Sequence, residues 1–187
     1  VAINDIIIDQ TNKLWVATNG QGLFHLEPEN GILSHFVYNN NQTINSNIVL
    51  SLFIDQKNNL WIGTEGGGLN LFQTKSKMFH FFKQSFDNDY SISDNSILSI
   101  RQGLDKTILV STVHGGISIF KNHLDIKRIS AEALGFNYKD GQSSTILEDS
   151  DKNIWLSAGR DGLRKYNANT QQTTSFIDNP KDSSDFS

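Results

Sequence analysis

The chain has 187 residues, which is enough for one domain with a hydrophobic core or for two small ones. It contains no cysteine, so disulfides, thiolate metal sites and a cysteine nucleophile are excluded. The formal net charge is −4 and the basic residues are scattered singly, so nucleic acid is not an expected partner.

The sequence repeats one unit four times. Trp15 and Trp61 lie 46 residues apart in the strings DQTNKLWVATNGQGLFHL and DQKNNLWIGTEGGGLNLF, and Trp155 lies 94 residues further on in DSDKNIWLSAGRDGLRKY. The third copy contains TILVSTVHGGISIF, with Leu109 at the tryptophan position and Gly103 at the position of the preceding aspartate. A repeat period of 40 to 50 residues indicates a solenoid, an array or a propeller.

Each copy is expected to contain four short strands. In the second copy, apolar residues alternate with period two around residues 50–54, 60–64, 69–71 and 79–81, between turns rich in Asn, Gly, Asp and Lys. Only the stretch SAEAL at 130–134 has helical character. The sequence therefore predicts an all-β fold: a β-propeller segment of four four-stranded antiparallel blades of about 46 residues.

Residues 1–187 are expected to form a single partial propeller domain. The blades are expected, in chain order, at 3–38, 48–84, 96–130 and 143–178, and 179–187 is expected to lead toward a further blade. Four blades leave apolar faces open at both ends, which further blades of the same protein or a second copy are expected to cover.

Equivalent positions of the repeat have structural roles. The aspartate ends the first strand and bonds the turn, the tryptophan packs between blades, and the glycine allows positive φ before the third strand. These positions are Asp9, Trp15, Gly22, Asp55, Trp61, Gly68, Leu109, Gly116, Asp149, Trp155 and Gly162. A small residue two places after the tryptophan position leaves room for the next sheet: Ala17, Gly63, Ser111 and Ser157.

The repeat, preceded by leads such as TINSNIVLSL and SISDNSILSI, resembles the regulator-propeller repeat of Bacteroides-type hybrid two-component systems. The resemblance covers nearly the whole chain and is weakest in the third copy. It implies that the chain is a fragment of a seven-bladed ring in a periplasmic sensor region. It also implies carbohydrate sensing, namely of polysaccharide breakdown products, to control transcription through a histidine kinase in the full-length protein.

Other motifs favour structural roles. The glycines at 66–68 lack a following GK[ST], so they are interpreted as a turn and not as a phosphate loop. Asp149, Asp151 and Asn153 match part of a calcium loop, but Ile154 stands where glycine is needed and no glutamate follows at the twelfth place. The order Asp, Asn, Trp resembles the Asp-box of sialidases, which is also structural. The five histidines lack metal-ligand spacing, and no metal or cofactor is expected.

The candidate ligand-binding residues lie beside the glycines of each turn before the third strand. They are Asn19, Gln21, Glu65, His114, Arg160 and Asp161. These turns should emerge on the face of the inter-blade links, around a central funnel, where polar side chains suit sugar hydroxyls or acidic sugar groups. Tyr90 and Phe136 in the links are expected to add a stacking surface. For each residue, simple exposure to solvent remains the alternative.

Two other functions remain open. A propeller face can act as a non-catalytic scaffold for protein interaction or dimerisation, and a propeller lyase or glycosidase is a further alternative. Enzyme activity is not expected for this segment, because no paired carboxylates or arginine cluster can be recognised in the sequence. No apolar run approaches the roughly 20 residues that span a bilayer, so the segment is not expected to contact a membrane.

Overall fold

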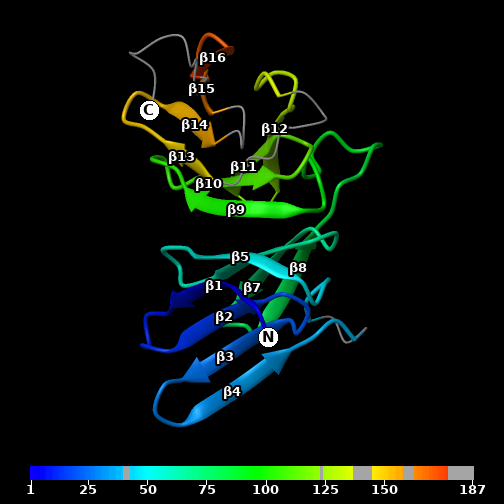
Figure 1. The fold of residues 1–187 in the computed structure, drawn as a ribbon, viewed down its shortest axis with the longest axis vertical. Helices are drawn as coiled ribbons and strands as arrows, with labels where there is room; N and C mark the ends of the chain where they lie inside the picture. Colours follow the sequence, from blue (N-terminus) through cyan, green and yellow to red (C-terminus); the bar gives the residue numbers. More distant parts are fainter. Residues whose placement is uncertain (40–42, 123, 137–144, 158–161, 177–187) are drawn as a thin grey trace.

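The computed structural model describes residues 1–39, 43–122, 124–136, 145–157 and 162–176 (Figure 1). Within them, sixteen strands form four antiparallel sheets of four strands, and the strands of each sheet are paired in chain order. The prediction of an all-β, four-blade architecture is confirmed.

The strands of the four sheets have the following bounds. The first sheet contains β1 (Ile3–Ile8), β2 (Leu14–Thr18), β3 (Leu23–Glu27) and β4 (Gly31–Phe36). The second contains β5 (Val49–Ile54), β6 (Leu60–Thr64), β7 (Leu69–Gln73) and β8 (Met78–Phe82). The third contains β9 (Ile97–Gln102), β10 (Ile108–Thr112), β11 (Ile117–Asn122) and β12 (Asp125–Ile129). The fourth contains β13 (Ile146–Glu148), β14 (Asn153–Ser157), β15 (Leu163–Asn167) and β16 (Gln172–Phe176).

The stretch at 130–134, which has helical character in the sequence, forms one turn and no helix. Residues 131–135 form a hydrogen-bonded turn, in which Leu134 N–H donates to the Ser130 carbonyl at 3.2 Å. Gly135 then adopts φ of 74°, and Phe136 N–H donates to the Ala131 carbonyl at 2.9 Å. A residue in the left-handed conformation ends helical winding, so the segment stops after one turn.

The hydrophobic core lies between successive sheets, which follow one another along the long axis of the molecule (Figure 1). Trp15 packs against Phe72 of the second blade, with ring centroids 5.7 Å apart. Trp61 meets Phe120 of the third blade edge to face at 5.4 Å. Trp15 and Trp61 therefore each lie between their own blade and the next.

The small residue after the tryptophan leaves room for the next blade. A Cβ on Gly63 would collide with Ser51 in its own sheet and would lie 2.8 Å from a methyl group of Ile97 in the next one. Contacts this short do not occur in packed proteins, so this position limits the distance between the sheets.

Apolar faces are open at both ends of the described arc. Ile6, Leu52, Ile100 and Ile146 occupy the same register position in the first strands of the four blades. Ile6 is 53% exposed, whereas Leu52 is 3% exposed and the other two are fully buried. At the other end of the arc, Leu147 is 50% exposed. The second, third and fourth blades thus bury the face that the first blade leaves open.

Candidate functional site

The structure places four of the predicted ligand residues in exposed turns between the second and third strands of their blades. These are Asn19, Gln21, Glu65 and His114. The other two, Arg160 and Asp161, lie outside the described residues. The four come from three different blades, and none of them lines the cavity described below. Their role in binding stays a prediction.

These turns share one face with the inter-blade links. Gly22 N–H donates to the Asn47 carbonyl and Gly68 N–H to the Asn95 carbonyl, both at 2.8 Å. The Asn47 side-chain oxygen also accepts from Tyr38 N–H at 2.7 Å. In the next link, the Asn95 side-chain oxygen accepts from Gln84 N–H, the equivalent position after the second blade, at 2.9 Å. The predicted site residues do not include these two asparagines, although both recur at the same place in the leads TINSN and SISDN.

The expected stacking surface in the links is wrong for Phe136. This ring is 4% exposed and belongs to the core between the third and fourth blades, where the Arg164 guanidinium lies 5.9 Å from its centroid. The turn at Gly135 carries the ring inward. Tyr90 is exposed. Together with Phe81 it borders a cavity of about 290 Å³, which is distinct from the larger cavity described below.

A carboxylate connects the first turn of a blade to its tryptophan. The Asp55 carboxylate accepts from the backbone N–H groups of Lys57 and Asn59 at 2.9 Å and from the Asn59 side-chain amide at 3.0 Å. It also accepts from the Trp61 indole N–H at 3.2 Å. A buried indole needs an acceptor, so one side chain fixes both the turn and the ring.

The same arrangement lowers the pKa of two carboxyl groups. Hydrogen bonds, the strongest from the Trp155 indole at 2.7 Å, lower the pKa of Asp149 to about 2. Burial opposes ionisation of Asp9, but hydrogen bonds from the Thr11 side chain and the turn amides outweigh it and lower its pKa to about 2. Both groups are therefore carboxylates at neutral pH.

The first blade adds an imidazole to this arrangement. The His25 ring stacks on Trp15 with centroids 4.0 Å apart, and its Nε2 lies 3.2 Å from the Asp9 carboxylate. Burial, with smaller contributions from Lys13 and Lys77, lowers the pKa of His25, although the Asp9 carboxylate acts to raise it. In the second blade, Leu71 occupies the position opposite the tryptophan.

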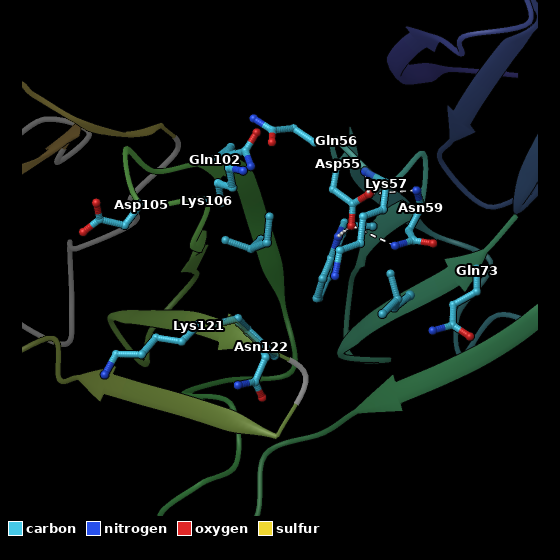
Figure 2. Close-up of a pocket in the computed structure, with 14 residues that line it drawn as sticks. Asp55, Gln56, Lys57, Asn59, Gln73, Gln102, Asp105, Lys106, Lys121 and Asn122 are labelled. Atoms are coloured by element: carbon cyan, nitrogen blue, oxygen red, sulfur yellow. Dashed lines mark hydrogen bonds between the residues drawn. The ribbon is translucent and has the colours of Figure 1, made fainter. Parts of the chain in front are cut away.

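A cavity of about 490 Å³ lies between the second and third blades, at the end of the blades away from the links (Figure 2). Its base is apolar and consists of Trp61, Leu71, Ile108 and Phe120. Because Trp61 is only 5% exposed, its ring shapes the base and does not offer an open stacking face. Cavities of this size accommodate small ligands.

Polar side chains line the rim of this cavity, which we call the inter-blade groove. The second blade supplies Asp55, Gln56, Lys57, Asn59 and Gln73. The third supplies Gln102, Asp105, Lys106, Lys121 and Asn122. Figure 2 shows the turn at 55–59 on one side of the groove and the turn at 102–106 on the other. An apolar base with converging polar groups is typical of a ligand site.

Neither acidic residue of the groove has a carboxylate that is free for a ligand. Asp55 accepts the four hydrogen bonds given above, and Asp105 forms an ion pair with Lys152 of the fourth blade at 2.7 Å. The Asp105 contact raises the pKa of Lys152. By contrast, the side chains of Gln56, Lys57, Gln102 and Lys106 have no partner within the described part of the chain.

The described residues contain no cluster of three or more histidine, aspartate or glutamate side chains able to hold a metal ion. Nor does any helix in this described part reach the length and apolarity needed to cross a membrane.

One family matches the sequence. Residues 43–66, which include β5 and β6, match the family described as Two component regulator propeller. No curated protein matches the chain.

Solved structures match the fold over nearly the whole chain. The extracellular domain of the hybrid two component system BT3049 from B. thetaiotaomicron is 18% identical and has a TM-score of 0.83, with 94% of this chain and 24% of that chain covered. The corresponding domain of BT4673 from the same organism is 18% identical with a TM-score of 0.71, covering 94% and 25%. Virginiamycin B lyase from Staphylococcus aureus is 13% identical with a TM-score of 0.70, covering 95% and 56%.

These likenesses define the fold as a β-propeller. The chain spans about a quarter of the length of the two extracellular domains, so it corresponds to a fragment of a larger propeller structure. More narrowly, residues 43–66 match a two component regulator propeller repeat, and the resemblance to the extracellular domains of hybrid two-component systems is confirmed. The likeness to the lyase is one of fold alone, because the identity is low.

Proposed function

We propose that the chain is part of the periplasmic sensor region of a hybrid histidine kinase and response regulator, and that it binds a carbohydrate or relays its binding. The observation that carries this proposal is the TM-score of 0.83 with the extracellular domain of a hybrid two component system. The repeat at residues 43–66 supports it independently from the sequence. In this role the segment itself is not catalytic.

The inter-blade groove supports a binding role. It combines an apolar base with unengaged amide and ammonium groups, which can donate hydrogen bonds to sugar hydroxyls or to acidic sugar groups. The turns with Asn19, Gln21, Glu65 and His114 offer polar groups on the opposite face. A sensor that contains both faces can bind a saccharide on one and contact a further domain through the other.

The test uses the full-length protein that contains this segment. Its kinase phosphorylation is measured in membranes with a panel of neutral and acidic oligosaccharides, and the melting temperature of its sensor region is measured with the same panel. A ligand that binds only the folded state raises the melting temperature by mass action. A panel that changes neither quantity would overturn the proposal.

The open apolar faces favour one alternative, a scaffold that functions only in association. Ile3, Ile6 and Ile8 are all more than half exposed on one edge of the arc. If this surface mediated only dimer contacts, the full-length protein would dimerise through it and respond to no saccharide. Light scattering of the full-length sensor region, with and without an Ile6→Asp substitution, separates the two functions.

A further inference from the structure

We infer that the inter-blade groove between the second and third blades selects an acidic saccharide, whose carboxylate or sulfate group is held between Lys57 and Lys106. The saccharide part of this inference rests on the proposed function. The preference for an anion rests on the groove itself.

The two lysines stand on opposite sides of the groove. Lys57 belongs to the turn between β5 and β6, and Lys106 belongs to the turn between β9 and β10 (Figure 2). Lys106 has φ of 61°, a left-handed conformation that the hydrogen-bonded turn imposes on it. Because the backbone of each turn is fixed, each lysine is anchored at a defined place on the rim.

The carboxylates of the groove do not neutralise the positive charges of these two lysines. Asp55 is saturated by donors from its own turn and from Trp61. Asp105 is paired with Lys152, outside the groove, and its carboxylate points away from the facing turn in Figure 2. Lys121, also on the rim, lies 3.9 Å from Asp125. The rim cations that have no acidic partner in the described part of the chain are therefore Lys57 and Lys106.

Two amides complete the recognition surface. Gln56 lies in the turn after β5 and Gln102 ends β9, and neither side chain is engaged in the described part of the chain. An amide both donates and accepts, which suits sugar hydroxyls, whereas an ammonium group only donates and suits an anion. Amides together with cations therefore suit an acidic sugar better than a neutral one.

Another cavity of similar size has one of its two cations already paired. It measures about 480 Å³ and is lined by Arg128 and Lys127, among others. The Arg128 guanidinium donates to Asp89 at 3.0 Å and lies 3.4 Å from the Ser91 hydroxyl. The arginine of that cavity therefore already has an anionic partner in the protein.

The experiment measures binding to the intact sensor region by titration calorimetry. The probes are oligogalacturonates of two to four units, the same oligosaccharides with methyl-esterified carboxyls, and neutral galactose oligomers. We expect the free acids to bind at least about tenfold more tightly than the esters, because the ester removes the charge and little else. The difference should shrink as salt is raised, since salt screens exposed charges.

The variant that tests the residues is the double substitution Lys57→Gln and Lys106→Gln. It should weaken binding of the free acids by about tenfold or more and leave binding of the esters within about twofold. The control is Lys75→Gln with Lys83→Gln, which removes the same charge from two exposed lysines that do not line the groove. This control should bind like the unmodified protein, and melting temperatures without ligand verify that both variants fold.

The outcomes separate the two proposals. Equal binding of acids and esters, or acid binding that survives the double substitution, overturns the acidic preference and leaves the carbohydrate sensor intact. Binding of none of the three sets of probes, together with no response of the kinase to the wider panel, overturns the sensor proposal itself.

Discussion

The Glu148 carboxylate accepts a hydrogen bond from Leu104 N–H in the neighbouring blade at 2.7 Å. Leu104 follows Gly103, the position where the other three blades carry the turn aspartate. A Cβ on Gly103 would lie 2.5 Å from the Glu148 oxygen, so the two carboxylates could not be present together without movement. The fourth blade thus supplies an acceptor to the turn of the third, at an amide one place after Gly103, whereas the aspartates of the other blades bind the amides two and four places on.

The energy of this contact between blades can be measured by a double-mutant cycle. Glu148→Ala should lower the free energy of unfolding by about 1 kcal/mol, through loss of the acceptor. Gly103→Asp alone should also destabilise, because it places a second carboxylate against Glu148. The double variant should be more stable than the sum of the single effects predicts, since the new aspartate then caps its own turn. Additive losses in urea unfolding would contradict this account.

The lowered pKa values predict how stability falls in acid. Asp9 and Asp149 have pKa values lowered from 3.8 to about 2 by hydrogen bonds. A carboxyl group whose pKa is lower in the folded state stabilises the fold above about pH 4 and loses this contribution as the pH falls toward 2. Urea unfolding between pH 5 and pH 2 should show this loss, and Asp149→Asn should reduce its slope. A slope unchanged in the variant would show that other carboxyls dominate.

His25 predicts a second pH effect, at higher pH. Its pKa is lowered, chiefly by burial, so the folded state favours the neutral ring. The neutral ring therefore contributes fully to the free energy of unfolding above about pH 6.5. This contribution is lost as the pH falls below that value, because His25 takes up a proton more readily in the unfolded chain than in the folded one. His25→Leu, which places in the first blade the residue found at the equivalent Leu71, should abolish the dependence between pH 7 and pH 5. Persistence of the full dependence would assign it to other groups.

Two glycines of one turn provide a matched comparison. Gly68 has φ of 82°, and a Cβ there would collide with the Phe82 carbonyl, whereas Gly66 has φ of 68° and open space around its Cβ position. Gly66→Ala should cost about 1 kcal/mol of unfolding free energy, from the left-handed backbone alone. Gly68→Ala should cost at least about 2 kcal/mol more, because the sheet must also shift. Similar losses for the two variants would show that the turn relaxes easily.

The open end of the first blade predicts a difference between two equivalent positions. Leu52→Ala should cost about 2–5 kcal/mol, because Leu52 is buried between blades. Ile6→Ala should cost little in the isolated chain, where Ile6 is 53% exposed, and about as much as Leu52→Ala in a longer protein that covers this face. A small cost in both proteins would mean that Ile6 is exposed in the intact molecule as well.

The sequence predicts the fold well because the recurring residues of each copy have local structural roles. The aspartate, tryptophan and glycine of each copy act within one turn or one pair of strands, so their spacing identifies them. Trp61 illustrates this, since its ring contacts Phe120 at a position that the period of the repeat predicts.

The inter-blade groove could not be found in the same way. Gln56 and Gln102 come from different blades and do not occupy equivalent repeat positions, so no period relates them. Their juxtaposition depends on how the second sheet packs on the third. The expectation for Phe136 failed for a related reason: a turn of the chain, and not the residue type, decides whether an aromatic ring faces solvent.

The asparagines of the links have a consequence for how such a protein can diversify. Asn47 and Asn95 hold the end of one blade and the β2–β3 and β6–β7 turns through bonds to backbone N–H groups. Because these joints involve no side chain of the turns, the residues next to the glycines can be exchanged without loosening the connection between blades. Duplication or mutation of such a unit can therefore change the side chains at the turn and leave the hydrogen bonds between link and turn unchanged.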